Sequence, residues 1–202
     1  MNKANGIPRQ ISTRSFYKRK YSLRELYRGY IPLVDSMARM RENRRENLVD
    51  VAFIERMQLA VTEVNGCAAC SYAHAHMALR QGMSAREIHS YLSGDGAFIK
   101  VEEAKGILFA QHFAESRGCP ERDAYEAIVG TYTEPGARIM LAALRIIQAG
   151  NMIGIPFSAF WSRLKGKPYA DSTLWYEIHM MVGGTLLLPA GLLHGLLGTR
   201  IG

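Results

Sequence analysis

The stretch from Glu55 to Met83 reads ERMQLAVTEVNGCAACSYAHAHMALRQGM and brings together two cysteines, two histidines and two carboxylates. Asn65-Gly66 is a strong helix-breaking pair, so one helix is predicted to end there and another to begin at the cysteines. Helix formers dominate the segment 68–79, and Gly82 is placed to cap its C-terminal end. The stretch therefore predicts two consecutive helices with the cysteines at their junction.

The spacing of Cys67, Cys70 and His74 places them on one face of the second helix. At about 100° per residue, Cys70 lies about 300° and His74 about 340° around the axis from Cys67. His76 lies about 180° away, on the opposite face. The spacing therefore selects His74, and not His76, as the histidine that can serve the cysteines.

The two cysteines and His74 form a unit suited to thiol chemistry. A thiolate is favoured near a helix N-terminus or a cationic imidazole, and two thiols three residues apart on one face can close a disulfide. A peroxide or a disulfide can oxidise such a pair, and a reductant can restore it. The helix-terminus argument favours Cys67 as the attacking thiol, whereas the spacing of His74 favours Cys70, so both assignments stay open.

Two other interpretations of the cysteines are a reduced, buried pair and a zinc site. Cys67, Cys70 and His74 point the same way and supply three potential zinc ligands, but a fourth has to come from elsewhere, for example from Glu55, His112 or Cys119. Cys119 is expected to be a lone surface or packing thiol. No metal and no cofactor are therefore predicted.

The rest of the chain shows helical periodicity and no series of short alternating runs. Ser22 and Glu25 form a capping-box pattern that begins a helix to about Met40, which Pro32 kinks or divides. The predicted breaks are a charged connector at 41–47, a stop at Glu134-Pro-Gly, and an interruption at Gly150, Gly154 and Pro156. The further predicted helices are 48–64, 84–92, 101–117, 120–132, 137–148, 157–164 and 172–181. The fold class is all-α, with the CxxC at the N-terminal end of a core helix.

The charge of the chain is concentrated near its N-terminus. The net charge is +7, yet residues 1–46 hold twelve Lys and Arg against four Asp and Glu, which leaves −1 for the remainder. We expect residues 1–21 to form a basic arm that packs on a neighbouring subunit. Interleaved tyrosines are compatible with nucleic-acid contact, but no recognition motif is present, so a nucleic-acid partner is not expected.

Two features bear on location. No secretory signal pattern opens the chain, and three cysteines do not make a disulfide framework, so a reducing, cytoplasmic location is expected. Residues 180–198 carry no formal charge, and their length makes them a candidate membrane span. Because this run holds five glycines and Pro189, we favour packed or interfacial helices, with membrane association through 180–198 as the alternative.

The pattern Glu55-x11-Cys67-x2-Cys70-x3-His74, embedded in AVTEVNGCAACSYAHAHMALRQGMS, resembles the alkylhydroperoxidase AhpD-like branch of the carboxymuconolactone decarboxylase superfamily. The resemblance covers about residues 45–115, and GNMIGIPFSAFWSRLKGKP resembles a segment of longer members. It implies an all-helical fold, trimers or hexamers, and reduction of hydroperoxides at the expense of a protein or small-molecule thiol. Glu55 and His74 would form a proton relay, and Cys67 and Cys70 the redox pair.

This sequence departs from the family pattern at one position. The peroxidase that names the branch has a histidine between its cysteines, where this chain has Ala69. Half of the relay is thereby missing, and Glu63 is the carboxylate that compensates if the chain folds it back toward Cys67. The lactone decarboxylase branch lacks the redox CxxC, so decarboxylation is disfavoured.

The sequence therefore predicts a thiol-dependent peroxidase or disulfide oxidoreductase for antioxidant defence, with Cys67, Cys70, His74, Glu55 and Glu63 as its site. Its predicted organisation is one helical domain over 22–202, with the core motif at 45–115 and a C-terminal extension at 120–202. The alternative function is a binding or scaffold protein that uses the basic arm and the apolar C-terminal run, with the CxxC as a sensor.

Overall fold

The computed structural model describes residues 15–201, and within this range it contains helices and no strand. A short 3-10 helix, η2 (Val101–Glu103), precedes α6, and the α-helices are α1 (Leu23–Tyr30), α2 (Leu33–Glu46), α3 (Val51–Asn65), α4 (Ala68–Arg80), α5 (Ala85–Ser93), α6 (Ala104–Glu115), α7 (Arg122–Tyr132), α8 (Glu134–Leu164) and α9 (Leu174–Ile201). The predicted all-α fold is confirmed. The predicted arm of residues 1–21 lies mostly outside the described residues.

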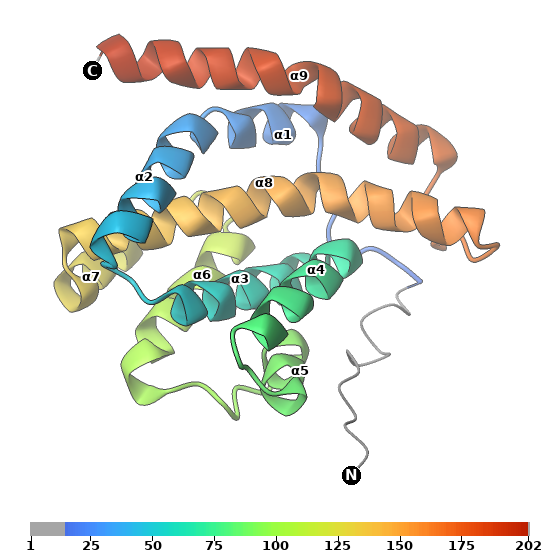
Figure 1. Ribbon diagram of the computed structural model, residues 1–202. Coiled ribbons are helices and arrows are strands. Elements are labelled where there is room, and N and C mark those ends of the chain that lie inside the picture. The colour runs from blue at the N-terminus through green and yellow to red at the C-terminus, as the bar shows by residue number, and fades with distance from the viewer. Residues whose placement is uncertain (1–14, 202) are drawn as a thin grey trace.

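Helix α8 runs through the middle of the molecule (Figure 1). It contacts α3 and α4 on one side and α1, α2 and α9 on the other. Helix α9 covers α1 on the side away from α3 and α4, as Figure 1 shows. The site residues on α3 and α4 are therefore held against the central helix.

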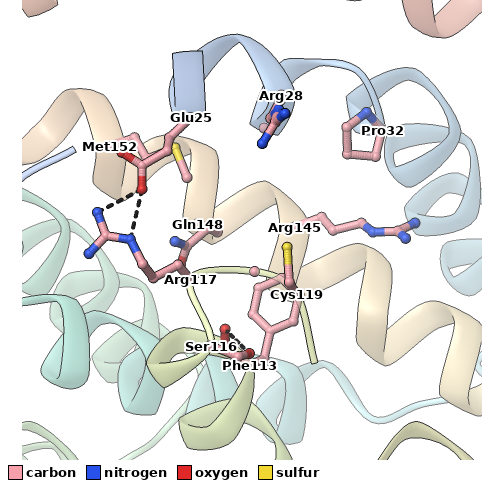
Figure 2. Close-up of a pocket in the computed structure, with 12 residues that line it drawn as sticks. Glu25, Arg28, Pro32, Phe113, Ser116, Arg117, Cys119, Arg145, Gln148 and Met152 are labelled. Atoms are coloured by element: carbon pink, nitrogen blue, oxygen red, sulfur yellow. Dashed lines mark hydrogen bonds and ion pairs between the residues drawn. The ribbon is translucent and has the colours of Figure 1, made fainter. Parts of the chain in front are cut away.

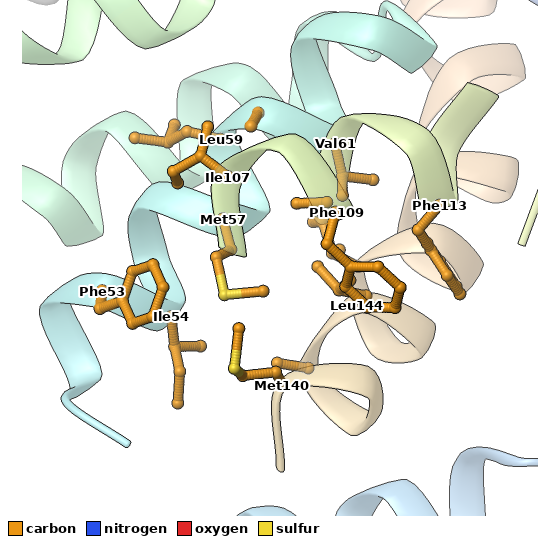
Figure 3. Close-up of a cluster of buried hydrophobic side chains, with 14 of the residues drawn as sticks. Phe53, Ile54, Met57, Leu59, Val61, Ile107, Phe109, Phe113, Met140 and Leu144 are labelled. Atoms are coloured by element: carbon orange, nitrogen blue, oxygen red, sulfur yellow. The ribbon is translucent and has the colours of Figure 1, made fainter. Parts of the chain in front are cut away.

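The main hydrophobic core fills the space between α3, α6 and α8 (Figure 3). Met57 of α3 and Met140 of α8 extend toward each other there, and both are fully buried. Gly106 of α6 has no side chain, and a Cβ at this position would overlap the ring of Phe53. This missing Cβ lets α6 lie close to α3, which fixes the helix that carries Glu55.

The first helices differ from the prediction at one boundary. Pro32 divides the predicted helix into α1 and α2, and the capping box of Ser22 with Glu25 is present. The predicted charged connector at 41–47 is wrong, because α2 continues to Glu46 and ends at Asn47 with φ of 50°. Arg and Glu have high helix propensity, and the left-handed Asn47 supplies the stop.

The predicted interruption of α8 is also wrong. The helix runs unbroken from Glu134 to Leu164, with Pro156 inside it. Glu134-Pro135 forms its first turn and is not a stop, since Thr133 accepts a hydrogen bond from the backbone N–H of Gly136. Tertiary packing of the buried helix overrides the local breaking tendency of Gly and Pro.

Four glycines of α9 face α1 and the residue that follows it: Gly183, Gly184, Gly191 and Gly195. A Cβ at Gly184 would stand 2.7 Å from Leu26, and one at Gly191 would stand 2.5 Å from Tyr30. At Gly195 it would overlap the backbone carbonyl oxygen of Ile31. The glycines in the apolar run therefore serve close helix packing.

Among the residues that the structure describes, two helices are long and apolar enough to cross a membrane. The most apolar window of Glu134–Leu164 is 67 % buried inside the fold, whereas that of Leu174–Gly198 is only 22 % buried. Burial accounts for the apolar sequence of α8 as a core helix. The outer face of α9 exposes large apolar side chains, among them Trp175, Val182, Leu186 and Leu193.

The described part of the N-terminal segment packs on its own domain. Tyr17 and Tyr21 are buried, and Lys18 forms an ion pair with Glu63 of α3. Arg19 donates a hydrogen bond to the carbonyl oxygen of Ala114 at 2.7 Å, and Lys20 donates one to the carbonyl oxygen of Asp171. These cations are engaged within the domain.

A buried ion pair attaches α9 to α8. The Glu177 carboxylate is fully buried and accepts hydrogen bonds from both Nε and Nη2 of Arg163 at 2.8 Å, and from the Ser172 hydroxyl at 2.5 Å. Burial disfavours ionisation of Glu177, but these hydrogen bonds outweigh it and hold the pKa of Glu177 below its ordinary value. The charged form is therefore the one that the fold stabilises.

We expect the stability from this pair to be present above pH 4.5, the ordinary pKa of Glu177, and to be lost as the pH falls through its lower value in the folded state. Glu177→Gln should lower the Tm at pH 7 by on the order of 5 °C. The difference from the wild type should shrink toward pH 3, as measured by circular dichroism. Glu134→Gln, at an exposed pair with Arg138, is the control and should change little. An equal Tm loss at both pH values would contradict the assignment.

Candidate active site

Cys67 and Cys70 lie where α3 turns into α4. Gly66 ends α3 in the left-handed conformation, with φ of 76°, and Cys67 is the N-cap of α4. A disulfide joins the two cysteines, whose Cα atoms are 5.3 Å apart. The backbone N–H of Cys70 donates to the sulfur of Cys67 at 3.2 Å. The sulfur of Cys67 thus receives a backbone hydrogen bond at a helix N-terminus, where negative charge is favoured.

A closed set of hydrogen bonds fixes the turn before the cysteines. The hydroxyl of Tyr21 donates to Oδ1 of Asn65 at 2.7 Å, and Nδ2 of Asn65 donates to Oε1 of Gln148 at 2.7 Å. Nε2 of Gln148 donates back to the Tyr21 hydroxyl at 3.1 Å. All three side chains are buried, so the end of α3 is held against α8 by satisfied polar groups.

Helix α8 lies directly behind the disulfide. A Cβ at Gly154 would stand 2.5 Å from the sulfur of Cys67 and 2.7 Å from that of Cys70. One turn later, the hydroxyl of Ser158 accepts a hydrogen bond from the backbone N–H of Ala69 at 3.0 Å and donates one to the carbonyl oxygen of Gly154 at 2.6 Å. The α8 backbone therefore forms one wall of the site.

Glu55 and His74 form a carboxylate–imidazole pair across α3 and α4. Oε1 of Glu55 and Nδ1 of His74 are 2.7 Å apart, and the two side chains are 6 % and 13 % exposed. With the carboxylate ionised, Nδ1 is the donor in this bond, which leaves Nε2 to accept or release a proton. The pair is therefore an oriented base that solvent reaches only in part.

Cys70 and His74 open onto the same hollow, of about 310 Å³. Cys67 is fully buried, so the disulfide is reached from the Cys70 side. The other residues around this hollow are small or apolar apart from one amide: Gln58, Ala69, Ala73, Ile146, Ile147 and Gly150. A reactant in it lies against both Cys70 and His74.

A second, larger hollow of about 590 Å³ lies beside the first at the start of α4. Its walls include Tyr72, Phe157 and Trp161, and Lys165 stands 5.4 Å above the Trp161 ring. Ala69 borders both hollows. The short side chain of Ala69, between the two cysteines, thus separates the aromatic walls of the second hollow from Cys70 in the first.

The structure brings together four of the five predicted site residues. Cys67, Cys70, His74 and Glu55 meet, whereas Glu63 pairs with Lys18 and is not directed at the cysteines. The Asn65-Gly66 turn separates Glu63 from the start of α4, which explains why the chain does not fold it back.

Two of the three residues considered as a fourth zinc ligand, His112 and Cys119, are not joined to the cysteines. His112 accepts a hydrogen bond from the backbone N–H of Glu121 at 3.2 Å, and Cys119 is an exposed free thiol. Within the range that the structure describes, no group of three or more His, Cys, Asp or Glu side chains is arranged to hold a metal ion. His76 packs against the Tyr72 ring, on the face away from Glu55.

Sequence reasoning missed the contribution of α8 to this site. Gly150, Gly154 and Ser158 recur every four residues, which places small side chains on one face of a helix. That spacing is the signal that points to α8, although the same glycines also predict an interrupted helix. Gln58, which shares the hollow with His74, carried no signal of its own.

Residues 32–111 match the model of the Carboxymuconolactone decarboxylase family. The matched segment is about two fifths of the chain and contains Glu55, Glu63, Cys67, Cys70 and His74. The predicted resemblance to this superfamily is therefore confirmed. The chain has no match among the curated proteins or the solved structures.

The close approach of α8 predicts opposite effects for two alanine substitutions. Gly154→Ala should lower the free energy of unfolding by about 1–3 kcal/mol, because its Cβ would overlap both sulfur atoms. Gly150→Ala is the matched control on the same helix, with nothing within 4 Å of its Cβ, and should raise the free energy of unfolding by up to about 1 kcal/mol. Urea unfolding of the oxidised proteins measures both. Equal changes in the free energy of unfolding for the two variants would show that α8 does not pack against the disulfide at Gly154.

Proposed function

We propose that the chain is a thiol-dependent peroxidase in which Cys67 and Cys70 cycle between dithiol and disulfide. The observation that carries this proposal is the Glu55–His74 pair, at 2.7 Å, opening onto the same hollow as the Cys70 sulfur. Peroxide reduction needs a thiolate, a proton for the leaving oxygen and a second thiol, and this hollow provides the groups for each. The match of residues 32–111 to a superfamily with thiol-active members supports the same conclusion.

In the proposed first step, the Cys70 thiolate attacks the terminal oxygen of a hydroperoxide. The O–O bond breaks, the sulfur becomes a sulfenic acid, and the leaving alkoxide takes a proton from His74 to give an alcohol. Cys70 is assigned this role because it lines the hollow with His74, whereas Cys67 is fully buried. Glu55 orients the imidazole through the 2.7 Å hydrogen bond at Nδ1.

In the second step, Cys67 attacks the sulfenic sulfur of Cys70, and the disulfide forms with release of water. A dithiol reductant then attacks the Cys70 sulfur, since that side of the disulfide faces the hollow. The sulfur that leaves is Cys67, the N-cap of α4, where the backbone N–H of Cys70 stabilises the departing thiolate. The cycle closes when the second thiol of the reductant attacks the mixed disulfide, which releases Cys70 as a thiol and leaves the reductant oxidised to a disulfide.

The substrate class follows from the hollow beside Ala69. Its aromatic walls favour a hydroperoxide with an apolar body over hydrogen peroxide, because the body gains contact area there. We also propose that the exposed apolar face of α9 packs on further copies of the chain, as the family resemblance implies. A reducing, cytoplasmic setting fits this cycle, with a cellular dithiol as reductant.

Cysteine substitutions test the cycle. With cumene hydroperoxide and dithiothreitol, Cys67→Ser and Cys70→Ser should each abolish turnover, and Cys119→Ser should retain it. Cys67→Ser should still accumulate one sulfenic acid, on Cys70, which dimedone labelling and mass spectrometry detect. A sulfenic acid on Cys67 in Cys70→Ser would reverse the assigned order. Full turnover in both site variants would exclude the proposed function.

The proposed Glu55–His74 relay predicts that His74 and His76, which lie on the same helix, affect the rate of oxidation differently. His74→Asn and Glu55→Gln should slow the oxidation of the pre-reduced protein by cumene hydroperoxide about 100-fold at neutral pH. His76→Asn, on the opposite face of α4, should leave this rate within about twofold of the wild type. Stopped-flow loss of thiol measures it. Comparable losses in both histidine variants would remove His74 from the mechanism.

A further inference from the structure

A separate hollow of about 400 Å³ lies between α1, α8 and the loop that follows α6 (Figure 2). Arg28 from α1, Arg117 from the loop and Arg145 from α8 stand around it, as Figure 2 shows. None of the proposed redox residues lines it. The hollow is therefore a feature of the fold that peroxide chemistry leaves unexplained.

The cations of this hollow exceed its anions. Glu25 is its one carboxylate, and Arg117 already neutralises it through Nε and Nη2, both 2.7 Å from Oε1. Arg28 and Arg145 have no hydrogen-bond or ion-pair partner for their side chains among residues 15–198. Two guanidinium groups therefore remain for an anion that enters the hollow.

Arg145 carries the stronger argument because it is half-buried. Burial lowers the pKa of Arg145 below its ordinary value, and the carboxylate of Asp35 offsets only part of this effect. Asp35 is itself engaged by Arg39, at 3.5 Å. A guanidinium that is desolvated without a hydrogen-bonded counterion gains free energy when an anion binds to it.

The remaining walls of the hollow are apolar. Phe113, Met152 and Pro32 line it between the arginines, and Figure 2 shows them on different sides. Such walls offer nothing to a small hydrated ion, but they bury an apolar body next to a charged head. The planar guanidinium fork matches a carboxylate through two parallel hydrogen bonds.

We propose that this hollow binds a small organic monocarboxylate, with its head at Arg145 and Arg28 and its apolar body against Phe113 and Met152. The site is independent of the peroxidase cycle, so either proposal can fail without the other.

Calorimetry of the oxidised full-length protein tests the proposal with octanoate as the probe. Octanoate should bind, and Arg145→Gln and Arg28→Gln should each weaken its binding at least about tenfold. Arg138→Gln, an exposed arginine on the same helix, is the matched control and should leave the affinity unchanged. Octanamide, which has the same chain without the charge, should also bind at least about tenfold more weakly than octanoate.

A second readout locates the ligand. Cys119 is an exposed free thiol at this hollow, and the other two cysteines are joined in the disulfide. Octanoate should slow the labelling of Cys119 by N-ethylmaleimide severalfold in the wild type and not in Arg145→Gln at the same concentration, as intact mass measures. This measurement does not depend on the redox activity of the chain.

Three outcomes would overturn the proposal. Equal binding of octanoate and octanamide would show that the charge is not recognised. Inorganic phosphate that binds as tightly as octanoate would show a general anion site without a role for the apolar walls. Octanoate that binds without slowing the labelling of Cys119 would place it elsewhere, for example on the exposed face of α9.

Discussion

The contact between the α8 backbone and the cysteine pair at Gly154 is the constraint on which the rest of the arrangement depends. Without a Cβ there, α8 lies close enough for Ser158 to bind the backbone of α4 and for Gln148 to bind Asn65 at the end of α3. These bonds fix the turn between α3 and α4, so the cysteines reach disulfide distance without ordering a flexible loop. A central helix that had been interrupted at Gly154, as the local sequence suggests, would provide no such wall.

The buried carboxylate–imidazole pair depends on the same geometry. Glu55 is buried in a helix most of whose residues are buried, and an isolated carboxylate in that position would be costly. His74 offsets this cost, but only because the turn at Gly66 brings α4 back along α3. The Glu55–His74 hydrogen bond thus both stabilises the buried carboxylate and orients the imidazole beside Cys70. Stability and chemistry share one hydrogen bond here.

The parts of this arrangement that the sequence predicted are those set by local rules. Helix periodicity placed Cys67, Cys70 and His74 on one face, and capping patterns located the starts of α1 and α5. The wall formed by α8 was not predictable in this way, because it joins residues almost ninety positions apart, such as Ala69 and Ser158. The sequence around Gly154 does not distinguish a glycine that breaks a helix from one that lets another segment pack closely against the helix. The position of Glu63 was not predictable for the same reason, since its pairing with Lys18 is set by tertiary packing.

The same distinction applies to the two apolar helices. A hydropathy pattern averages over all faces of a helix, so it cannot separate a core helix from one that presents an apolar surface. Helix α8 is apolar because it is surrounded by other elements, whereas α9 is apolar on both faces for different reasons. Its inner face has glycines that let α1 approach, whereas its outer face leaves Trp175, Val182 and Leu186 exposed in the part of the chain that the structure describes. An outer face of this kind is explained by a further surface that covers it, and the proposed assembly of several copies supplies one.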